Sequence, residues 1–541
     1  MGPQLRDAAG LAALRRLTTS RSTLFAVGLL CVAFLLRAIF LGERQLFRDE
    51  AASWLLARYP LPDLLTHTAQ EPYPPLYLLV LKGWTWVAGD SEAALRALSV
   101  AFGMVVVIVG WRWTRESMGV RAGLVGLALL AISPLAIANA RDVRMYAMES
   151  ACATTAWWLT WRLASGRSEG RRRWVDTVAL ALAVSAELWT FSLGLPIAAL
   201  QFAVSTVGWI RGRRSQDLFA PAAIVVGGTT FLPWLPTAVE AANGQPFWTP
   251  PPHVQDLAYT YASVLGGFRL TPWIPGAAIV LILAGVGVVL LVTGRAGAST
   301  GREGTRRAAS PLGAAVVAGL ALVPLVWLYS QFHSVYDSRY FGACVAPLAL
   351  GAAIGCTWAS KRITSSGARS LAWLGVASLL LGGTITWIGD WRSEVGLAPA
   401  RQLLVSLEQR MRPGDVAVSL DARSYFQMAY LLGRDGTPDH LPGPLYCWNS
   451  GDDPFFYGQS LLPPGTLVSA DDADRMDWPS RLPGLAAHGS IWLIALANGA
   501  SERLGFRPLD LGDVHEVERV FVAPTGETGQ LRELVVNADS P

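Results

Sequence analysis

Long apolar segments recur along most of this sequence, and they constrain its fold more than any other feature. A helix that crosses a lipid bilayer needs about 20 mostly apolar residues, and about eleven segments meet that requirement. They are Leu24–Leu41, Ala93–Trp111, Gly119–Ala138, Val143–Leu163, Trp174–Phe191, Leu193–Ile210, Leu218–Pro236, Ile274–Val292, Pro311–Ser330, Tyr340–Trp358 and Leu371–Ile388. Only 16% of the residues are charged, against about 25% in soluble domains. The sequence therefore predicts a polytopic α-helical membrane protein.

Arginines gather in alternate loops between these segments, which gives the predicted topology. The basic loops are 112–121, 162–173, 211–214, 295–307 and 361–369. Short loops rich in Lys and Arg stay in the cytoplasm. With eleven spans, all of these loops lie on the same side as the N-terminus. We therefore expect a plasma-membrane protein with a cytoplasmic N-terminus and an extracytoplasmic C-terminus. Short arginine clusters divided among several loops do not predict a nucleic-acid partner.

One further apolar stretch, Pro74–Ala88, is not counted as a span. It is short and contains Lys82, Trp84 and Trp86. Counting it would invert every later loop, so an amphipathic helix lying at the outer interface fits the pattern better. The basic N-terminal segment and the apolar run after it resemble a signal peptide. That run is too long for one, and no small-residue cleavage site follows, so we expect an uncleaved first span.

The chain changes character after about Arg392, because no later run is long enough to cross a membrane. The C-terminal segment alternates a predicted helix with predicted strands, namely Ala400–Met411 followed by Asp415–Leu420, Ser490–Ala495, Val517–Val522 and Leu531–Val536. We predict a cytoplasmic tail at 1–23, a membrane domain at 24–390 with its first outer loop at 42–92, and an extracytoplasmic α/β domain at 391–541. The five cysteines show no spacing typical of a disulfide framework or a zinc site.

Acidic residues cluster at both ends of the first outer loop. Asp49 and Glu50 follow the first span, and Glu71 lies near the end of the loop. Carboxylates close to lipid headgroups are costly unless they are hydrated, paired or bound to a cation. Such groups can supply a general base and a ligand for a metal or a hydroxyl group. The alternative is a solvated loop whose acids cap helices.

Several segments, in order, resemble the C-type glycosyltransferases related to protein O-mannosyltransferases and lipid A aminoarabinose transferases. They are Asp49-Glu50 followed by Trp54, Glu71-x-x-Pro-Pro-Leu-Tyr, Asp90–Arg96, Asn139–Ala147 and Ser338-Arg339-Tyr340. The stretch Asn139–Ala147 is similar to that family's Ser-Gln-Glu-Ala-Arg-Met-Tyr-Ala segment. The resemblance covers the membrane part, from about Leu24 to Asp390. The C-terminal segment carries no motif of its own.

The resemblance implies an inverting transfer of a sugar from a polyprenyl-phosphate carrier to an acceptor hydroxyl. Asp49 matches the family's first-loop aspartate and would be the general base, with Glu50 supporting it. The implied substrate-binding residues are Arg96, Arg144, Tyr146, Glu71, Tyr77 and Arg339. Arginines are needed where negative charge builds on the leaving phosphate. The alternative for each arginine is a side chain that snorkels to the membrane interface.

The sequence departs from the family pattern at two positions. Tyr73 replaces the histidine of the usual His-Pro-Pro-Leu-Tyr-Tyr, so an imidazole role there is absent. Asp142 replaces the glutamate of the Gln-Glu-Ala-Arg pattern. A divalent cation held by Glu71 and Asp142 is the only cofactor that the sequence brings into question. His67 is better explained as a satisfied loop histidine than as a ligand.

Other classes of function stay open at this point. A transporter or lipid flippase would carry paired charges at mid-membrane depth and broken helices in matching halves. Glu149 and Glu187 lie in predicted spans without showing such pairing in the sequence. A binding protein that kept the fold and lost catalysis is the third option. The composition, rich in Ala, Arg, Gly and Trp, suits a high-GC bacterium. The expected acceptor is accordingly an envelope glycan, glycolipid or protein. Membrane lipids are the other expected partners.

Overall fold

The fold is described from a computed structural model of the chain. The structure describes residues 3–70, 73–212, 218–244, 250–266, 274–295, 303–362, 399–419, 422–433, 444–449, 467–469, 490–498, 514–522 and 527–536, together with 365, 367, 370 and 382. The chain divides into two compact units. The first comprises Met1–Ile39, Pro72–Tyr77 and Arg96–Ile388, and the second comprises Phe40–Glu71, Leu78–Leu95 and Gly389–Pro541. Each unit is described by itself.

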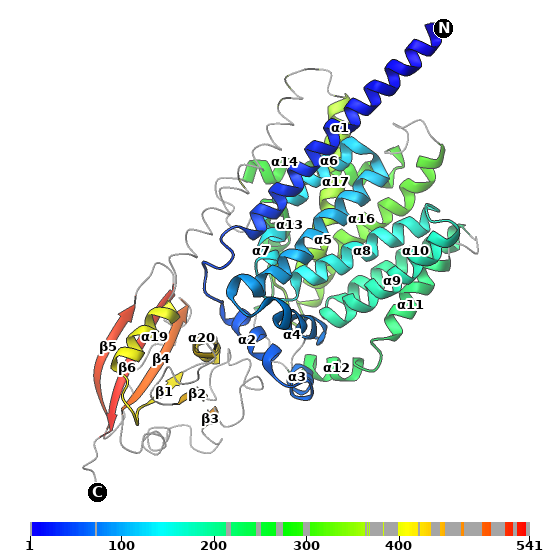
Figure 1. Cartoon of the computed structure of the whole chain (residues 1–541). Coiled ribbons are helices and arrows are strands. Elements are labelled where there is room, and N and C mark those ends of the chain that lie inside the picture. The colour runs from blue at the N-terminus through cyan, green and yellow to red at the C-terminus, as the bar shows by residue number, and fades with distance from the viewer. Residues whose placement is uncertain are drawn as a thin grey trace. The chain divides into compact units, whose positions relative to one another are not determined.

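The first unit is built from helices, drawn in Figure 1. They are α1 (Pro3–Ala38), α5 (Glu92–Met118), α6 (Val120–Ile132), α7 (Pro134–Ala140), α8 (Tyr146–Ala164), α9 (Gly170–Thr190), α10 (Gly194–Gly212), α11 (Phe219–Thr229), α12 (Leu235–Gly244), α13 (Val254–Gly266), α14 (Ile274–Val292), α16 (Glu303–Tyr329), the 3-10 helix η2 (Ser338–Cys344) and α17 (Val345–Arg362). Helices occupy every predicted span from Leu24 to Trp358. The predicted span Leu371–Ile388 lies outside the described residues.

Membrane-spanning character is clear for part of this set. Within the described residues, four helices are long and apolar enough to cross a membrane: Arg21–Ala38 of α1, α5, Pro311–Tyr329 of α16, and Ser338–Arg362. The pair α6 and α7, bent by 55°, makes a fifth when it is counted as one broken span. The predicted total of about eleven spans stays a prediction.

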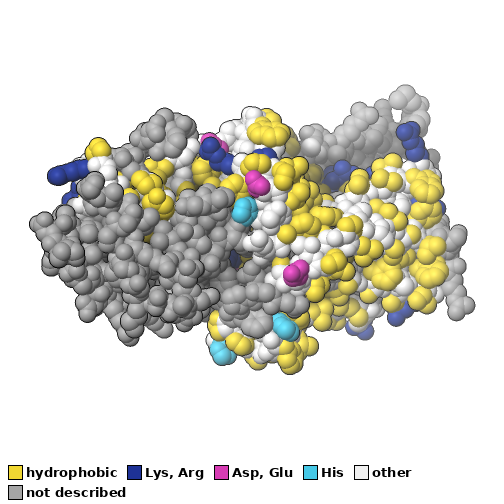
Figure 2. Space-filling model, turned by 90° about the horizontal axis from the view of Figure 1, so that it is seen from below, with side chains coloured by type: hydrophobic (Ala, Val, Ile, Leu, Met, Phe, Trp, Pro, Cys, Tyr) yellow, Lys and Arg dark blue, Asp and Glu magenta, His cyan; other side chains and the backbone are white. Residues whose placement is uncertain are grey.

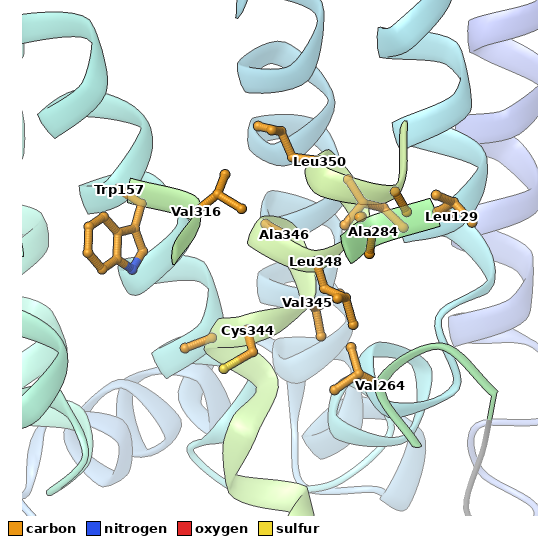
Figure 3. Packing of buried hydrophobic residues seen from close by; sticks show 14 of the residues in the cluster. Leu129, Trp157, Val264, Ala284, Val316, Cys344, Val345, Ala346, Leu348 and Leu350 are labelled. Carbon is orange, nitrogen blue, oxygen red and sulfur yellow. The ribbon is translucent and has the colours of Figure 1, made fainter. Parts of the chain in front are cut away.

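Small residues bring two core helices of this unit into close contact. In α17, Gly351 and Gly355 are four residues apart, the spacing that lets membrane helices approach closely. Opposite them on α14 is Gly287, where an added Cβ would collide with the Gly351 backbone. Figure 3 shows the surrounding core, in which side chains from α6, α8, α13, α14, α16 and α17 meet.

A proline bends α6 away from α7, and Arg37 of α1 stabilises the bend. Pro134 has no N–H, so it cannot donate to the Leu130 carbonyl four residues earlier. The fully buried Arg37 guanidinium donates instead, from Nη2 to Leu130 O at 3.0 Å and from Nη1 to Ala131 O at 2.9 Å. Buried carbonyls are costly without a donor. This arginine therefore has a structural task inside the bundle.

The outer surface of this unit is apolar, as a lipid-facing surface requires. Large hydrophobic side chains are exposed along α1, α9 and α11, including Phe25, Trp174, Leu182, Val225 and Val226. Among the described residues on the face that Figure 2 shows, hydrophobic side chains cover broad areas and charged ones are few. Exposed apolar surface of this extent is not expected on a soluble monomer.

The second unit combines the first outer loop with the C-terminal segment. The loop forms α2 (Arg48–Arg58), α3 (Leu61–Ala69) and most of α4 (Leu76–Ala88). At 13 residues, α4 is the short helix predicted at Pro74–Ala88. The C-terminal segment contributes α19 (Pro399–Arg410), β1 (Val416–Ser419), α20 (Ala422–Gly433), β2 (Leu445–Asn449), β3 (Leu467–Ser469), β4 (Ile491–Asn498), β5 (Val514–Val522) and β6 (Glu527–Val536). The sequence predicts the loop as part of the membrane domain. Here it groups with the C-terminal segment.

The strands form one mixed sheet in the order β3-β2-β1-β4-β6-β5. The four strands β3, β2, β1 and β4 run parallel to one another, and β6 runs antiparallel to both β4 and β5. Figure 1 shows α19 lying against the sheet. Leu403 and Leu407 of α19 pack with Met428 of α20 and with Ala417 and Trp492 of the sheet. The predicted helix at Ala400–Met411 and the four predicted strands correspond to α19, β1, β4, β5 and β6.

Candidate functional site

Asp49 and Glu50 occupy the first turn of α2, in the second unit, and their surroundings differ. Glu50 is fully buried, and its Oε2 accepts from Phe47 N at 2.7 Å and from Arg44 Nη2 at 3.0 Å. It therefore caps the start of α2, where a negative charge is favourable, and its charge is balanced by Arg44. Asp49 is only partly buried. Of the two carboxylates, Asp49 is the one more open to water and substrates.

A cluster of arginine and tyrosine side chains lies in the first unit. The Arg144 guanidinium is 5.0 Å from the centre of the Tyr73 ring and 5.9 Å from that of Tyr146. Arg339 is 5.7 Å from the ring centres of both Tyr146 and Tyr340. Tyr146 thus lies between two guanidinium groups. Cation–π contacts of this kind hold arginines in place.

Phe191 contacts the three tyrosine rings of this cluster. Its ring centre lies 6.1 Å from that of Tyr73, 5.8 Å from that of Tyr146 and 5.2 Å from that of Tyr340. We call the six residues Tyr73, Arg144, Tyr146, Phe191, Arg339 and Tyr340 the arginine–tyrosine cluster. The sequence predicts Arg144, Tyr146 and Arg339 as substrate-binding residues, and the structure places them together. Tyr73 and Phe191 were not predicted as members of the site.

Backbone packing fixes the segment that carries Arg339. Asn139 Nδ2 donates to Arg339 O at 3.1 Å. Asp337 Oδ1 accepts from the backbone N–H of Arg339 at 3.0 Å, and its Oδ2 forms an ion pair with Arg339 Nε at 2.9 Å. At Gly342 an added Cβ would collide with the Ser150 hydroxyl. The segment is therefore tied to α7 and α8, close to Tyr146. Figure 1 shows α8 running beside α9 and α10.

The other predicted substrate-binding residues have different surroundings. Arg96 is almost completely buried in α5, and Tyr77 is also buried. Asp142 accepts a hydrogen bond at its backbone oxygen from Ser99, one turn after Arg96. Glu71 lies outside the described residues. The predicted roles of Arg96, Tyr77 and Asp142 stay predictions.

The predicted cation site is not tested by this structure. Across the described ranges, no group of three or more His, Cys, Asp and Glu side chains gathers closely enough to hold a metal ion. Glu71, one of its two predicted ligands, lies outside those ranges. His67 stacks on Tyr59 with ring centres 4.7 Å apart. Burial, with smaller contributions from Tyr425 and Asp63, raises the pKa of Tyr59, so its phenol stays protonated.

Two buried carboxyl groups lie inside the first unit. Glu149 belongs to α8 and Glu187 to α9, and these two helices pack against each other. Gln201 Nε2 donates to Glu187 Oε2 at 3.1 Å. Neither Glu149 oxygen has a hydrogen-bond partner among the described residues. In the sequence, the lack of paired charges counts against a transporter or flippase. The burial of both acids in neighbouring helices weakens that objection.

Comparison with known proteins gives one family match and several structures of similar fold. Residues 72–236 match the family described as dolichyl-phosphate-mannose-protein mannosyltransferase. The apo structure of ArnT from Cupriavidus metallidurans matches with a TM-score of 0.59 at 16% identity, covering 95% of this chain and 98% of that one. The same protein bound to undecaprenyl phosphate matches at 0.57 and 14% identity, with the same 95% and 98% coverage. This chain has the C-type glycosyltransferase fold.

A more distant protein has the same fold. The oligosaccharyltransferase of Archaeoglobus fulgidus, in a complex with Zn and sulfate, matches with a TM-score of 0.51 at 12% identity, covering 94% of this chain and 72% of that one. No curated protein sequence matches this chain. The resemblance read from the ordered motifs is confirmed, and the chain is a multi-pass membrane protein with this fold.

Proposed function

We propose that this chain transfers a sugar from a polyprenyl-phosphate carrier to an acceptor hydroxyl on the outer face of the membrane. The observation that carries the proposal is the arginine–tyrosine cluster, found on a C-type glycosyltransferase fold. The cluster contains two guanidinium groups, those of Arg144 and Arg339, and Asp337 forms an ion pair with Arg339. A phosphate at the membrane surface is the kind of ligand that such a cluster binds.

The chemistry follows from the charges that develop. The acceptor oxygen attacks the anomeric carbon as the bond from that carbon to the carrier phosphate breaks. The carrier leaves as polyprenyl phosphate, and attack from the opposite face inverts the anomeric configuration. Arg144 and Arg339 stabilise the negative charge that builds on the leaving phosphate. Asp49 takes the proton of the acceptor hydroxyl as general base.

Tyr73, Tyr146 and Tyr340 add a second task. Their rings orient the two guanidinium groups, and their faces suit the apolar face of a sugar ring. Replacement of the family's histidine by Tyr73 therefore exchanges an imidazole for an aromatic contact with Arg144. We propose an envelope glycan, glycolipid or protein as the acceptor, because the reaction would take place outside the cytoplasm.

The test is direct assay of the purified protein in lipid nanodiscs with a panel of polyprenyl-phosphate sugars. Mass spectrometry of the lipid fraction detects released carrier, and mass spectrometry of the acceptor detects the added sugar. We expect carrier release with at least one donor and loss of that release in Arg144→Ala. Binding of donors without release of carrier from any of them would identify a binding protein instead.

A transporter or flippase is the second candidate, and the buried Glu149 and Glu187 are the observation that favours it. Ionisable residues inside a membrane protein often mark an ion or proton pathway. The test is transbilayer movement of a fluorescent polyprenyl-phosphate lipid in liposomes. Movement that depends on the protein and is lost in Glu187→Gln would support transport. No movement above protein-free liposomes would exclude it.

A further inference from the structure

We infer that helix α20 of the C-terminal segment positions Asp49, and that Gln427 is the positioning residue that matters most. The inference rests on the proposed function, because it gives Asp49 the task of general base. It also gives the C-terminal segment a role in catalysis, although that segment carries no catalytic motif. All the residues involved belong to the second unit.

Helix α20 holds α2 at both ends. Before α2 begins, the buried Gln427 donates from Nε2 to Leu46 O at 3.0 Å. At the last residue of α2, Arg58 donates from Nη1 to Gly433 O at 3.1 Å. Asp49 lies between these two anchors, three residues after Leu46. A helix fixed at both ends cannot rotate or slide without breaking one of the two contacts.

The middle of α2 is fixed by an aromatic contact. Trp54 meets Tyr430 of α20 edge to face, with ring centres 5.1 Å apart. Asp90 accepts from both residues, its Oδ2 from Trp54 Nε1 at 3.1 Å and its backbone oxygen from the Tyr430 hydroxyl at 3.3 Å. A Cβ added at Gly433 would lie 3.0 Å from Trp54 Cη2, so glycine is the residue that lets Trp54 fit.

Helix α20 packs against the sheet, so the position of α2 depends on the hydrophobic core of the second unit. Met428 and Leu432 pack into the core formed by α19, β1 and β4. Leu46 is 1% exposed, so its carbonyl has little access to water if the Gln427 amide is removed. The loop before α2 would then move to find another donor, and Asp49 would move with it. Misplacing a catalytic group by about 1 Å can cost about 10²-fold in rate.

The experiment is a double-mutant cycle on carrier release in nanodiscs. Gln427→Ala is expected to lower kcat about tenfold or more while KM for the donor changes less than about twofold, because donor binding does not use Asp49. In the Asp49→Asn background the same change is expected to cost less than about twofold, since the group that it positions is gone. The matched control is Gln409→Ala on the exposed face of α19, expected to keep the normal kcat.

Each outcome separates positioning from simple stability. An equal loss of kcat from Gln427→Ala in both backgrounds would mean that Gln427 acts on the fold as a whole, and the inference would be wrong. Wild-type turnover in Asp49→Asn alone would instead remove the general base from the proposed function. If Gln427→Ala does not fold, as judged by thermal unfolding, Gly433→Ala enters the same cycle, because its Cβ displaces Trp54.

Discussion

Replacing Gly287 by alanine should separate two core helices, and the structure gives the size of the effect. A Cβ at Gly287 would lie 2.8 Å from the carbonyl carbon of Gly351 and closer still to its oxygen. Carbon atoms in favourable contact are about 3.5–4.0 Å apart, and the oxygen is closer than the carbon, so α14 and α17 would have to separate by more than roughly 0.7 Å. The obstacle is backbone, which cannot turn aside as a side chain can.

Overpacking of this kind costs about 1–3 kcal/mol, which corresponds to a fall of about 1–3 °C in the unfolding midpoint of a chain of this length. The control is Gly285→Ala, two residues away on the same helix, where an added Cβ meets nothing within 4 Å. Thermal unfolding in detergent, followed by the fluorescence of the 22 tryptophans, compares the two variants. Equal midpoints for both variants would refute the close packing of α14 against α17.

Three further predictions test the site, the core and the topology. Arg144→Ala should weaken binding of a polyprenyl-phosphate donor by about 10–100-fold through loss of a charge-assisted contact, whereas replacement of the exposed Arg121 by alanine should leave the affinity unchanged. Equal affinities of the two variants in direct binding would mean that Arg144 only snorkels to the membrane interface. Glu149→Met should raise the free energy of unfolding by about 1–3 kcal/mol, because it removes a buried carboxyl whose oxygens have no partner among the described residues; a loss of stability in thermal unfolding would show that the carboxyl does have one. Cysteines placed at the exposed positions Arg171 and His253 should react with an impermeant maleimide from opposite sides of the membrane, and labelling of both from one side would contradict the predicted topology.

The helices of the first unit were predictable because their signal is local. The segment Ile274–Val292 has the same bounds in the prediction and in α14, since the length of an apolar run can be read directly from the sequence. The bend inside Gly119–Ala138 was missed, although Pro134 is visible in the sequence. Its stabilisation by Arg37 depends on a residue about a hundred positions away. The predicted span Leu218–Pro236 became the shorter α11, which ends at Thr229 just after two adjacent glycines.

The site was predictable only in part. Ordered motifs indicated Arg144, Tyr146 and Arg339, and these residues lie together. Tyr73 counted in the sequence only as a missing histidine, and its contact with Arg144 needed coordinates. The grouping of the first outer loop with the C-terminal segment has no local signal either. It depends on single long-range contacts such as Gln427 to Leu46, which composition and periodicity do not encode.

The central claim is that the chain catalyses sugar transfer with Asp49 as general base. Its most direct test is the rate of carrier release in a single turnover, measured by mass spectrometry with saturating donor and acceptor. An Asp→Asn change keeps the shape of the side chain and removes the proton acceptor. The matched control is Asp63→Asn, an exposed acid of the same loop. We expect Asp49→Asn to lose about 10²-fold or more in rate with donor affinity preserved, and Asp63→Asn to keep the normal rate. A folded Asp49→Asn protein that releases carrier at the normal rate would contradict the account.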